Sequence, residues 1–410
     1  MRFDIKLSGK KTLSMPAVLD RIPSNLQLPI DLMAGMPWWR EVSAETTLNL
    51  VVPEDYEMKM QAAFGKSEVI GIQNLLTLAR RGVRFQVTWH AGVAQKLTSS
   101  ASIFPLLAVL LLLRNASHMV IFADSSLAEM PIAQIRRAIF KHRFARDFFA
   151  DSEIVVCADA AGETLPVDLY DIKTLKLHPR EDFETLVVEA LVAQLDDSLG
   201  RAAIYKSASA LGVIVAELFE NTEMHGKLDL DGKPLGKDSL RGLIFKRVKV
   251  EVPILRPTSG AARTQVIDCF EASIFDSGVG YFSSYTRDNV KGNTPLDDEW
   301  MVLHNCLERH YYPDLADHRA GHRALGLYEV LRALQTLKGR IEIRTGRLFA
   351  YRTFLDGEIQ VQMQPRAEFS RLAWPVPKLL DVEKKYRARP SENEPLIGSS
   401  VRIVIPLTAK

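Results

Sequence analysis

In the first 180 positions, the spacing of apolar residues alternates between a strand pattern and a helix pattern. Strands are predicted at residues 47–52, 84–89, 119–122 and 153–157. Helices are predicted at about 55–81, which ends just before Gly82, and at about 100–114. Strands that alternate with helices along the chain favour an α/β layer.

Residues 181–410 show a different order, with two helices first and most of the strands later. The helices are predicted at about 181–199, 202–225, 297–309 and 325–337. Strands are predicted at residues 243–252, 265–275, 340–344, 348–354, 358–363 and 400–406. The Asp356-Gly357 turn favours a hairpin, and residues 383–395, charged and with two prolines, indicate a surface loop. The final strand alternates apolar and polar residues and is expected to be central.

Composition adds a size estimate and few restrictions on function. The chain has 410 residues, 47% hydrophobic and 25% charged, and at about 150 residues per domain we expect two domains, 1–180 and 181–410. The net charge of +2 does not indicate nucleic acid as a partner. The most apolar run, 103–113, is shorter than the roughly 20 residues of a membrane span, and residues 1–6 show no apolar signal core. We therefore expect a cytoplasmic protein with no membrane partner.

The predicted helix at 202–225 carries three polar residues at intervals of four, Glu217, Asn221 and His225. At about 100° per residue they form one stripe along the edge of an apolar arc. A carboxylate, an amide and an imidazole beside a core-facing surface suit the wall of a pocket. A partly solvated polar stripe has the same spacing, and spacing alone favours that simpler interpretation.

An apolar strand runs directly into the sequence Asp276-Ser277-Gly278-Val279-Gly280. A carboxylate at a strand end can accept a hydrogen bond from a ligand amine, and glycines let the backbone turn tightly and approach a flat ring. The alternative is a plain glycine turn after a strand.

A glycine-containing loop precedes the predicted helix at 325–337 and holds Gly321, His322, Arg323 and Gly326. Glycines before a helix N-terminus expose backbone N–H groups and the helix dipole to an anion, and His322 and Arg323 would add positive charge. An ordinary capping loop fits equally well. Ser399, in Gly398-Ser399-Ser400 before the final strand, has no meaning alone.

In their order along the chain, these elements resemble the ATP-binding domain of the GHKL superfamily, which includes sensor histidine kinases, type II topoisomerase ATPase subunits, mismatch-repair ATPases and anti-sigma-factor serine kinases. The resemblance covers about residues 181–410 and is closest to the anti-sigma-factor serine-kinase branch, because the helix ends Asn-x-x-x-His-Gly. It implies a Bergerat-fold α/β sandwich with a mixed sheet and helices on one face. Residues 1–180 resemble the STAS-type fold only loosely and are expected to form an α/β regulatory or partner-binding domain.

The resemblance implies that the chain binds ATP and Mg²⁺. Asn221 would hold Mg²⁺ against the phosphates, and Glu217 would orient or deprotonate the attacking water. His225 would lie near the phosphates, Gly321 and Gly326 would belong to the phosphate loop, and residues 281–320 would form a lid.

The adenine ring would bind at the other end of the site. Asp276 would accept from its exocyclic amine, and Gly278 and Gly280 would shape the pocket. Ser399 stands where the family commonly has Thr, which helps to bind adenine. Ala324 stands where the phosphate loop usually has Gly, so we expect slow turnover.

Three functions remain open. The first is an ATP-hydrolysing conformational switch in intracellular signalling or stress or defence, acting on a protein partner; a homodimer is compatible with it. The second is a protein serine/threonine kinase, in which Glu217 acts on a protein hydroxyl. The third is a non-enzymatic nucleotide-sensing module, which Ala324 favours. No histidine stands in the sequence context of a phosphoacceptor, which argues against a self-phosphorylating histidine kinase.

Overall fold

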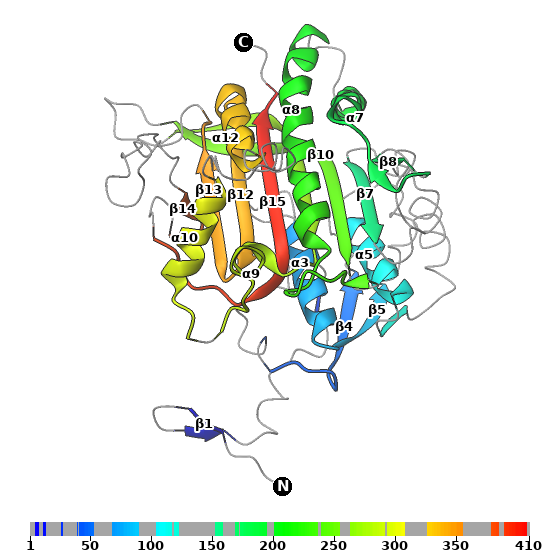
Figure 1. Cartoon of the computed structure of the whole chain (residues 1–410), viewed down its shortest axis with the longest axis vertical. Helices are drawn as coiled ribbons and strands as arrows, with labels where there is room; N and C mark the ends of the chain where they lie inside the picture. The colour runs from blue at the N-terminus through cyan, green and yellow to red at the C-terminus, as the bar shows by residue number, and fades with distance from the viewer. Residues whose placement is uncertain are drawn as a thin grey trace, which may run out of the picture.

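The structure is a computed structural model, and it describes residues 5–7, 11–13, 26–27, 39, 41–52, 68–89, 104–116, 119–122, 152–158, 169–171, 173–194, 201–236, 239–254, 263–291, 293–307, 326–355, 379–384 and 389–407. Within them, helices lie between and around a sheet of seven strands and a sheet of four (Figure 1). Two short strand pairs, β1–β2 and β8–β9, stand apart; their bounds are Ile5–Leu7, Lys11–Leu13, Tyr170–Asp171 and Lys176–Leu177. The predicted α/β fold is confirmed.

The seven-stranded sheet forms the centre of the C-terminal part. Its order is β14 (Leu380–Asp381), β13 (Leu348–Thr353), β12 (Arg340–Gly346), β15 (Leu396–Pro406), β11 (Arg263–Asp276), β10 (Leu240–Ile254) and β7 (Ser152–Ala158). Its strand pairs are antiparallel. The final strand, β15, lies in the middle, as its alternating pattern predicts.

Three long helices cover one face of this sheet: α7 (Arg180–Gln194), α8 (Arg201–Asn221) and α12 (Gly326–Leu337) (Figure 1). Alternate apolar residues of the strands, such as Ile274, Ile341 and Ile403, point into the core beneath them. The helices α7 and α8 approach closely, since a Cβ on Gly212 would lie 2.7 Å from the Cα of Glu184. This close approach fixes the start of α7 beside the end of α8.

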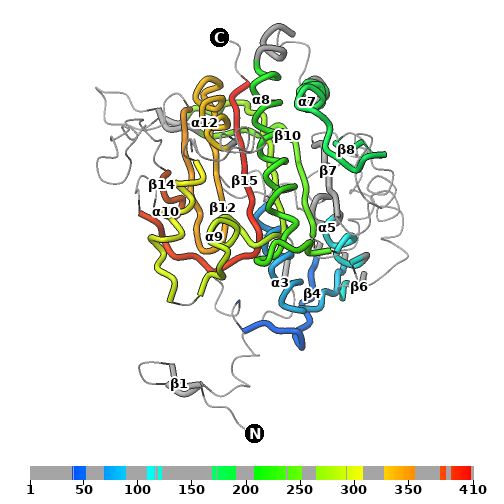
Figure 2. Tube along the Cα trace, viewed as in Figure 1, coloured from blue at the N-terminus to red at the C-terminus, as the bar shows by residue number. Residues whose placement is uncertain are grey.

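The N-terminal part forms a parallel sheet in the order β3 (Leu26–Gln27), β4 (Thr47–Val52), β5 (Arg84–Trp89) and β6 (Val120–Phe122). Parallel neighbours need a crossover connection, and α3 (Glu68–Arg80) is the helix between β4 and β5. Residues 71–79 of α3 are buried. α3 packs against β15 and β11 and against α5 (Phe104–Asn115) (Figure 2).

Two features of the sheet differ from the sequence prediction. The resemblance placed helices on one face only, whereas α3 covers the opposite face near the ends of β11 and β15. In addition, β7 comes from the N-terminal part yet pairs with β10. Hydrophobic spacing identifies an element but does not say which sheet it joins, because any apolar face satisfies the pattern.

Other predicted elements shift by a few residues or lie outside the described residues. The helix predicted at 202–225 ends as an α-helix at Asn221 and continues as a π-helix, η3 (Thr222–Gly226). The helix predicted at 297–309 is α10 (Leu296–Leu307). The strand predicted at 358–363 and its Asp356-Gly357 turn lie outside the described residues. Within the described part of the chain, no helix combines the length and apolar character needed to cross a bilayer.

Candidate nucleotide-binding site

A cavity of about 210 Å³ opens at the end of the sheet where α8 stops. Its walls come from α8 and η3, from the end of β11, from α9 (Gly280–Thr286), and from α10, α12 and β15. The predicted site residues in its wall are Asn221, His225, Asp276, Gly280 and Ser399. The structure thus brings together three sequence segments that are far apart in the chain.

The end of α8 places a polar edge on this cavity. Asn221 is the last α-helical residue, and its buried Nδ2 atom has no hydrogen-bond partner among the residues that the structure describes. The π-helical turn that follows widens the helix, a feature often found at functional sites. His225, in that turn, is exposed, and its Nδ1 lies 3.1 Å from Ser284 Oγ of α9.

Asp276 lines the cavity and is 4% exposed. Its Oδ1 accepts from the backbone N–H of Gly278 (2.9 Å) and of Ser399 (3.3 Å), and its Oδ2 accepts from the Ser399 hydroxyl. Asp276 and Ser399 are direct register partners on β11 and β15. Burial raises the pKa of Asp276 above its usual value, and these hydrogen bonds only partly oppose the shift.

Glycines let three chain segments close around Asp276. A Cβ on Gly226 would lie 2.6 Å from the Asp276 Cβ, and a Cβ on Gly398 would lie 1.9 Å from the Asp276 carbonyl oxygen. A Cβ on Gly278 would lie 2.7 Å from the Gly226 Cα. Gly398 also has φ +67°, which favours glycine. Gly278 therefore does not line the cavity but packs against Gly226, which does. The packing of Gly226 against Asp276 is a role that we did not assign from the sequence.

Aromatic side chains form a further part of the wall. Gly280 begins α9 with φ +79°, and the next residue, Tyr281, donates its backbone N–H to Thr345 Oγ1 (3.0 Å). Tyr281 and Tyr285 lie one turn apart and both line the cavity. Burial raises the pKa of the Cys306 thiol, also in the wall, to about 12. An aromatic pair four positions apart, directly after Asp-x-Gly-x-Gly, is the sequence signal for this part of the wall.

Glu217 lies one turn before Asn221 and is not part of the cavity wall. It is 6% exposed and forms an ion pair with Arg180, the first residue of α7. The close approach of α7 and α8 at Gly212 brings the two side chains together. No sequence signal predicted this pair, because it depends on how two helices cross.

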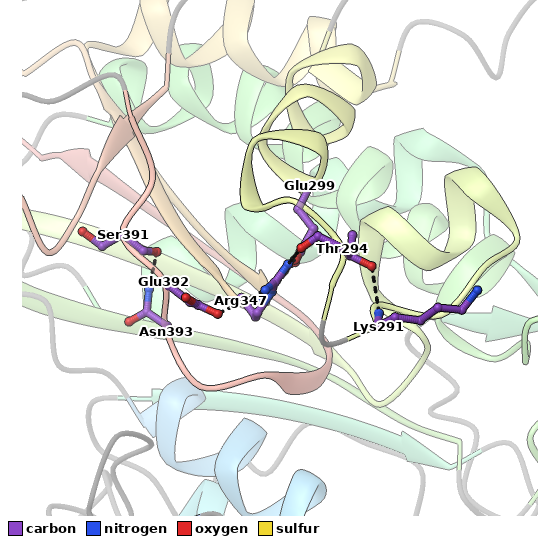
Figure 3. Close-up of polar contacts among 7 residues, drawn as sticks. All are labelled: Lys291, Thr294, Glu299, Arg347, Ser391, Glu392 and Asn393. Carbon is purple, nitrogen blue, oxygen red and sulfur yellow. Dashed lines mark hydrogen bonds and ion pairs between the residues drawn. The ribbon is translucent and has the colours of Figure 1, made fainter. Parts of the chain in front are cut away.

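The predicted lid, 281–320, includes two ordered helices, α9 and α10. The start of α10 is held by Arg347, whose Nε donates to Glu299 Oε1 (2.6 Å) and whose Nη2 donates to the Thr294 carbonyl (2.6 Å) (Figure 3). Arg347 Nη1 also donates to Glu392 Oε1 (3.1 Å), in the segment before β15. These contacts fix the start of α10 to the turn between β12 and β13. Residues 308–320 of the predicted lid lie outside the described residues.

The predicted phosphate loop lies mainly outside the described residues. This applies to Gly321, His322 and Arg323. Gly326 is the first residue of α12, and the next residue, Leu327, lines the cavity. The N-terminus of α12 is therefore close to the cavity, as the predicted anion site requires.

Comparison of the chain with protein-family models, with curated proteins and with solved structures gave no match. Among the described residues, no three His, Cys, Asp or Glu side chains group in a way that could hold a metal ion.

Proposed function

We propose that the chain is a Mg-ATP-binding protein of the GHKL type and that it uses slow ATP hydrolysis as a conformational switch in the cytoplasm. The observation that carries the proposal is that Asn221, Asp276 and Ser399, from three separate motifs, line one cavity. Each motif alone is ambiguous, and a shared cavity is the arrangement that a nucleotide site needs.

The cavity suits the nucleoside part of ATP. Its volume of about 210 Å³ is below the ~300–1,000 Å³ common for whole-ligand pockets, so the phosphates would extend beyond it. Asp276 is a buried acceptor held by three donors and would accept from the exocyclic amine of adenine. The rings of Tyr281 and Tyr285 offer apolar surface to the base.

Asn221 fits a Mg²⁺–phosphate role because it lines the cavity. Its buried Nδ2 has no hydrogen-bond partner in the described part of the chain and would donate to a phosphate oxygen. Mg²⁺ in nucleotide sites commonly binds one or two protein oxygens together with phosphates and waters, so a cluster of acidic ligands is not required. When bound, Mg²⁺ would neutralise phosphate charge. Asn221 would hold and orient that ion through its side-chain oxygen, and the N-terminus of α12 would attract the phosphates.

Glu217 is the proposed base that orients the attacking water, and its ion pair with Arg180 bears on turnover. A carboxylate engaged by a guanidinium must leave that contact, or share it, before it can bind water. The pair therefore supports slow hydrolysis. It also favours one alternative, a nucleotide-sensing module with negligible turnover that acts by docking to a protein partner.

The test is ATP-binding calorimetry combined with phosphate release on the same samples. Asp276→Ala should weaken ATP binding about 100-fold, because a hydrogen bond to a buried charged group contributes ~1.5–3 kcal/mol. Asp268→Ala, at a partly exposed site on the same strand, is the matched control and should bind like the wild type. Unchanged ATP binding in Asp276→Ala would show that the adenine assignment is wrong.

Glu217→Ala then separates the functional alternatives. We expect it to bind ATP normally and to lose phosphate release. Tight ATP binding by the wild type without any product would select the nucleotide-sensing module. A labelled protein band after incubation with labelled ATP and cell extract would select the protein kinase.

A further inference from the structure

Helix α3 carries polar side chains into the interior between the two sheets. Gln73 and Thr77 lie one turn apart on this helix and are 0% and 2% exposed. Buried polar side chains are normally hydrogen-bonded. Their partners therefore show which part of the protein this helix holds in place.

Most hydrogen-bond partners of Gln73 are residues of β15 near Ser399, and its Nε2 also lies 3.5 Å from the Arg344 carbonyl oxygen on β12. Gln73 Nε2 donates to the carbonyl oxygens of Ile397 (3.1 Å) and Gly398 (3.4 Å). Gln73 Oε1 accepts from the Ser400 hydroxyl (3.2 Å). One side chain thus bonds the backbone before Ser399 and the side chain of the residue after it.

Two neighbours of Gln73 extend the contact. Thr77 Oγ1 accepts from the backbone N–H of Ile397 (3.1 Å), and Arg80 Nη2 donates to the Ser277 carbonyl (3.0 Å). Ser277 directly follows Asp276 in the chain. The helix is therefore bonded to both strands that supply the buried Asp–Ser pair.

Alternation along β15 connects this contact to the cavity. Side chains of successive strand residues point to opposite faces, so Ser400 points to α3 while Ser399 points into the cavity and bonds Asp276. Gly398, whose carbonyl accepts from Gln73, donates its N–H to the Gly278 carbonyl (2.7 Å). A displacement of α3 would therefore move the β15 backbone and, with it, the Ser399 hydroxyl.

We propose that Gln73 is a positioning residue of the nucleotide site. It fixes the backbone of residues 397–400 and so holds the Ser399 hydroxyl against Asp276 on the other face of the sheet. This inference rests on the proposed ATP site and extends it, because docking of α3 and binding of adenine become linked. Linkage is reciprocal: ATP tightens α3 on the sheet, and a partner that displaces α3 releases ATP.

The first test compares Gln73→Met with the wild type. Methionine has a similar volume and removes both the donor and the acceptor. We expect about tenfold weaker binding of ATP, and of adenosine by the same factor, because the lost contact orients the adenine end. Both ligands are measured by calorimetry at a temperature where each protein is folded. Arg81→Gln is the control, since it removes the bond from Arg81 to the Trp39 carbonyl at the end of α3 and leaves β15 untouched.

A double variant distinguishes positioning from a general loss of stability. Gln73 and Ser400 act through one bond, so Gln73→Met with Ser400→Ala should bind ATP no more weakly than Gln73→Met alone. Losses that multiply would overturn the proposal. If Gln73→Met does not fold, Ser400→Ala and Thr77→Val are measured singly. Each removes one bond between α3 and β15 and should weaken ATP and adenosine binding by the same factor; unchanged binding of both ligands in both variants would overturn the proposal.

Amide hydrogen exchange measures the same coupling in the other direction, from bound ATP to helix α3. ATP should slow exchange in residues 68–80 of the wild type but not in Gln73→Met. Wild-type protein that binds ATP with no change in α3 exchange, or Gln73→Met that binds ATP and adenosine normally, would disprove the coupling alone. Wild-type protein that does not bind ATP would instead disprove the proposed function.

Discussion

The two faces of the seven-stranded sheet use the same strands in opposite ways. The face under α8 and α12 is apolar along its length and becomes polar only at the cavity. The opposite face carries polar and charged side chains along its middle strands, Glu271, Ser273, Glu342, Ser400 and Arg402, and most of them are buried. One face therefore supplies hydrophobic stability and the candidate site, while the other is held by hydrogen bonds and ion pairs that depend on correct alignment.

The largest effect should follow from breaking the charged face. Arg402 forms ion pairs with Glu271 (2.7 Å) and Glu342 (3.1 Å), whose carboxylates are 1% and 3% exposed. Arg402→Ala leaves both without this partner, and we expect a loss of about 3–5 kcal/mol in the free energy of unfolding. Urea denaturation measures it. Arg247→Ala, which breaks a partly exposed pair with Asp268, should cost less than about 1 kcal/mol; equal losses would remove the distinction between the two faces.

A substitution on the helix-covered face should affect binding more than stability. Gly226→Ala places a methyl group 2.6 Å from the Asp276 Cβ, so the carboxylate must shift. We expect about 30-fold weaker ATP binding, equivalent to ~2 kcal/mol, in calorimetry. Gly236→Ala is the control: its φ of +59° strains the backbone, but a Cβ there meets no atom within 4 Å, so it should lose stability and bind ATP like the wild type. A Gly226→Ala protein with wild-type affinity would show that the position of Asp276 does not matter for the ligand.

Acid should weaken the charged face selectively. Burial alone would raise the pKa of Glu271, but Arg402 and Lys246 outweigh it and lower the pKa from 4.5 to about 2. Stability from Glu271 is therefore complete above pH 4.5 and is lost as the pH falls towards 2, by on the order of 1–2 kcal/mol at pH 3. The pKa of Asp276 is raised, so its effect on the free energy of unfolding has the opposite sign: it favours the folded state at low pH and is lost as the pH rises.

Urea denaturation of the wild type and of Glu271→Gln, at pH 7, 4.5 and 3, measures this contribution. The variant should lose less stability than the wild type between pH 7 and pH 3. Equal losses would contradict the proposed role of Glu271.

The smallest effect should come from Arg180→Ala. Its side chain is 49% exposed, and partly exposed ion pairs contribute only about 0.2–1 kcal/mol. Releasing Glu217 should raise phosphate release about two- to fivefold with ATP affinity unchanged. A slower reaction would indicate that Arg180 assists Glu217 instead of restraining it.

The sequence predicted the fold class, most helices and strands, and five of the residues that line the cavity. Local pattern was enough for Asp276, because a strand that ends in Asp-x-Gly-x-Gly places its carboxylate at the strand end. Local pattern did not predict the contacts of Arg180 with Glu217 or of Gln73 with β15. Each acts through a contact between elements distant in the chain, and helix crossing and sheet docking are set by packing that no local spacing encodes. The π-helical turn after Asn221 has no periodic signal either.

The pairing of β7 with β10 has a practical consequence for fragments of this protein. A chain that starts at residue 181 would lack β7 and leave residues 240–246 of β10 with unpaired backbone N–H and C=O groups. Open strand edges recruit strands from other molecules and lead to aggregation. Such a fragment would also lack α3, so Ser400 would lose its acceptor. Insolubility of an isolated 181–410 fragment would therefore reflect the exposed edge of β10 and not a defective nucleotide site. A fragment intended for expression should include β7 and α3.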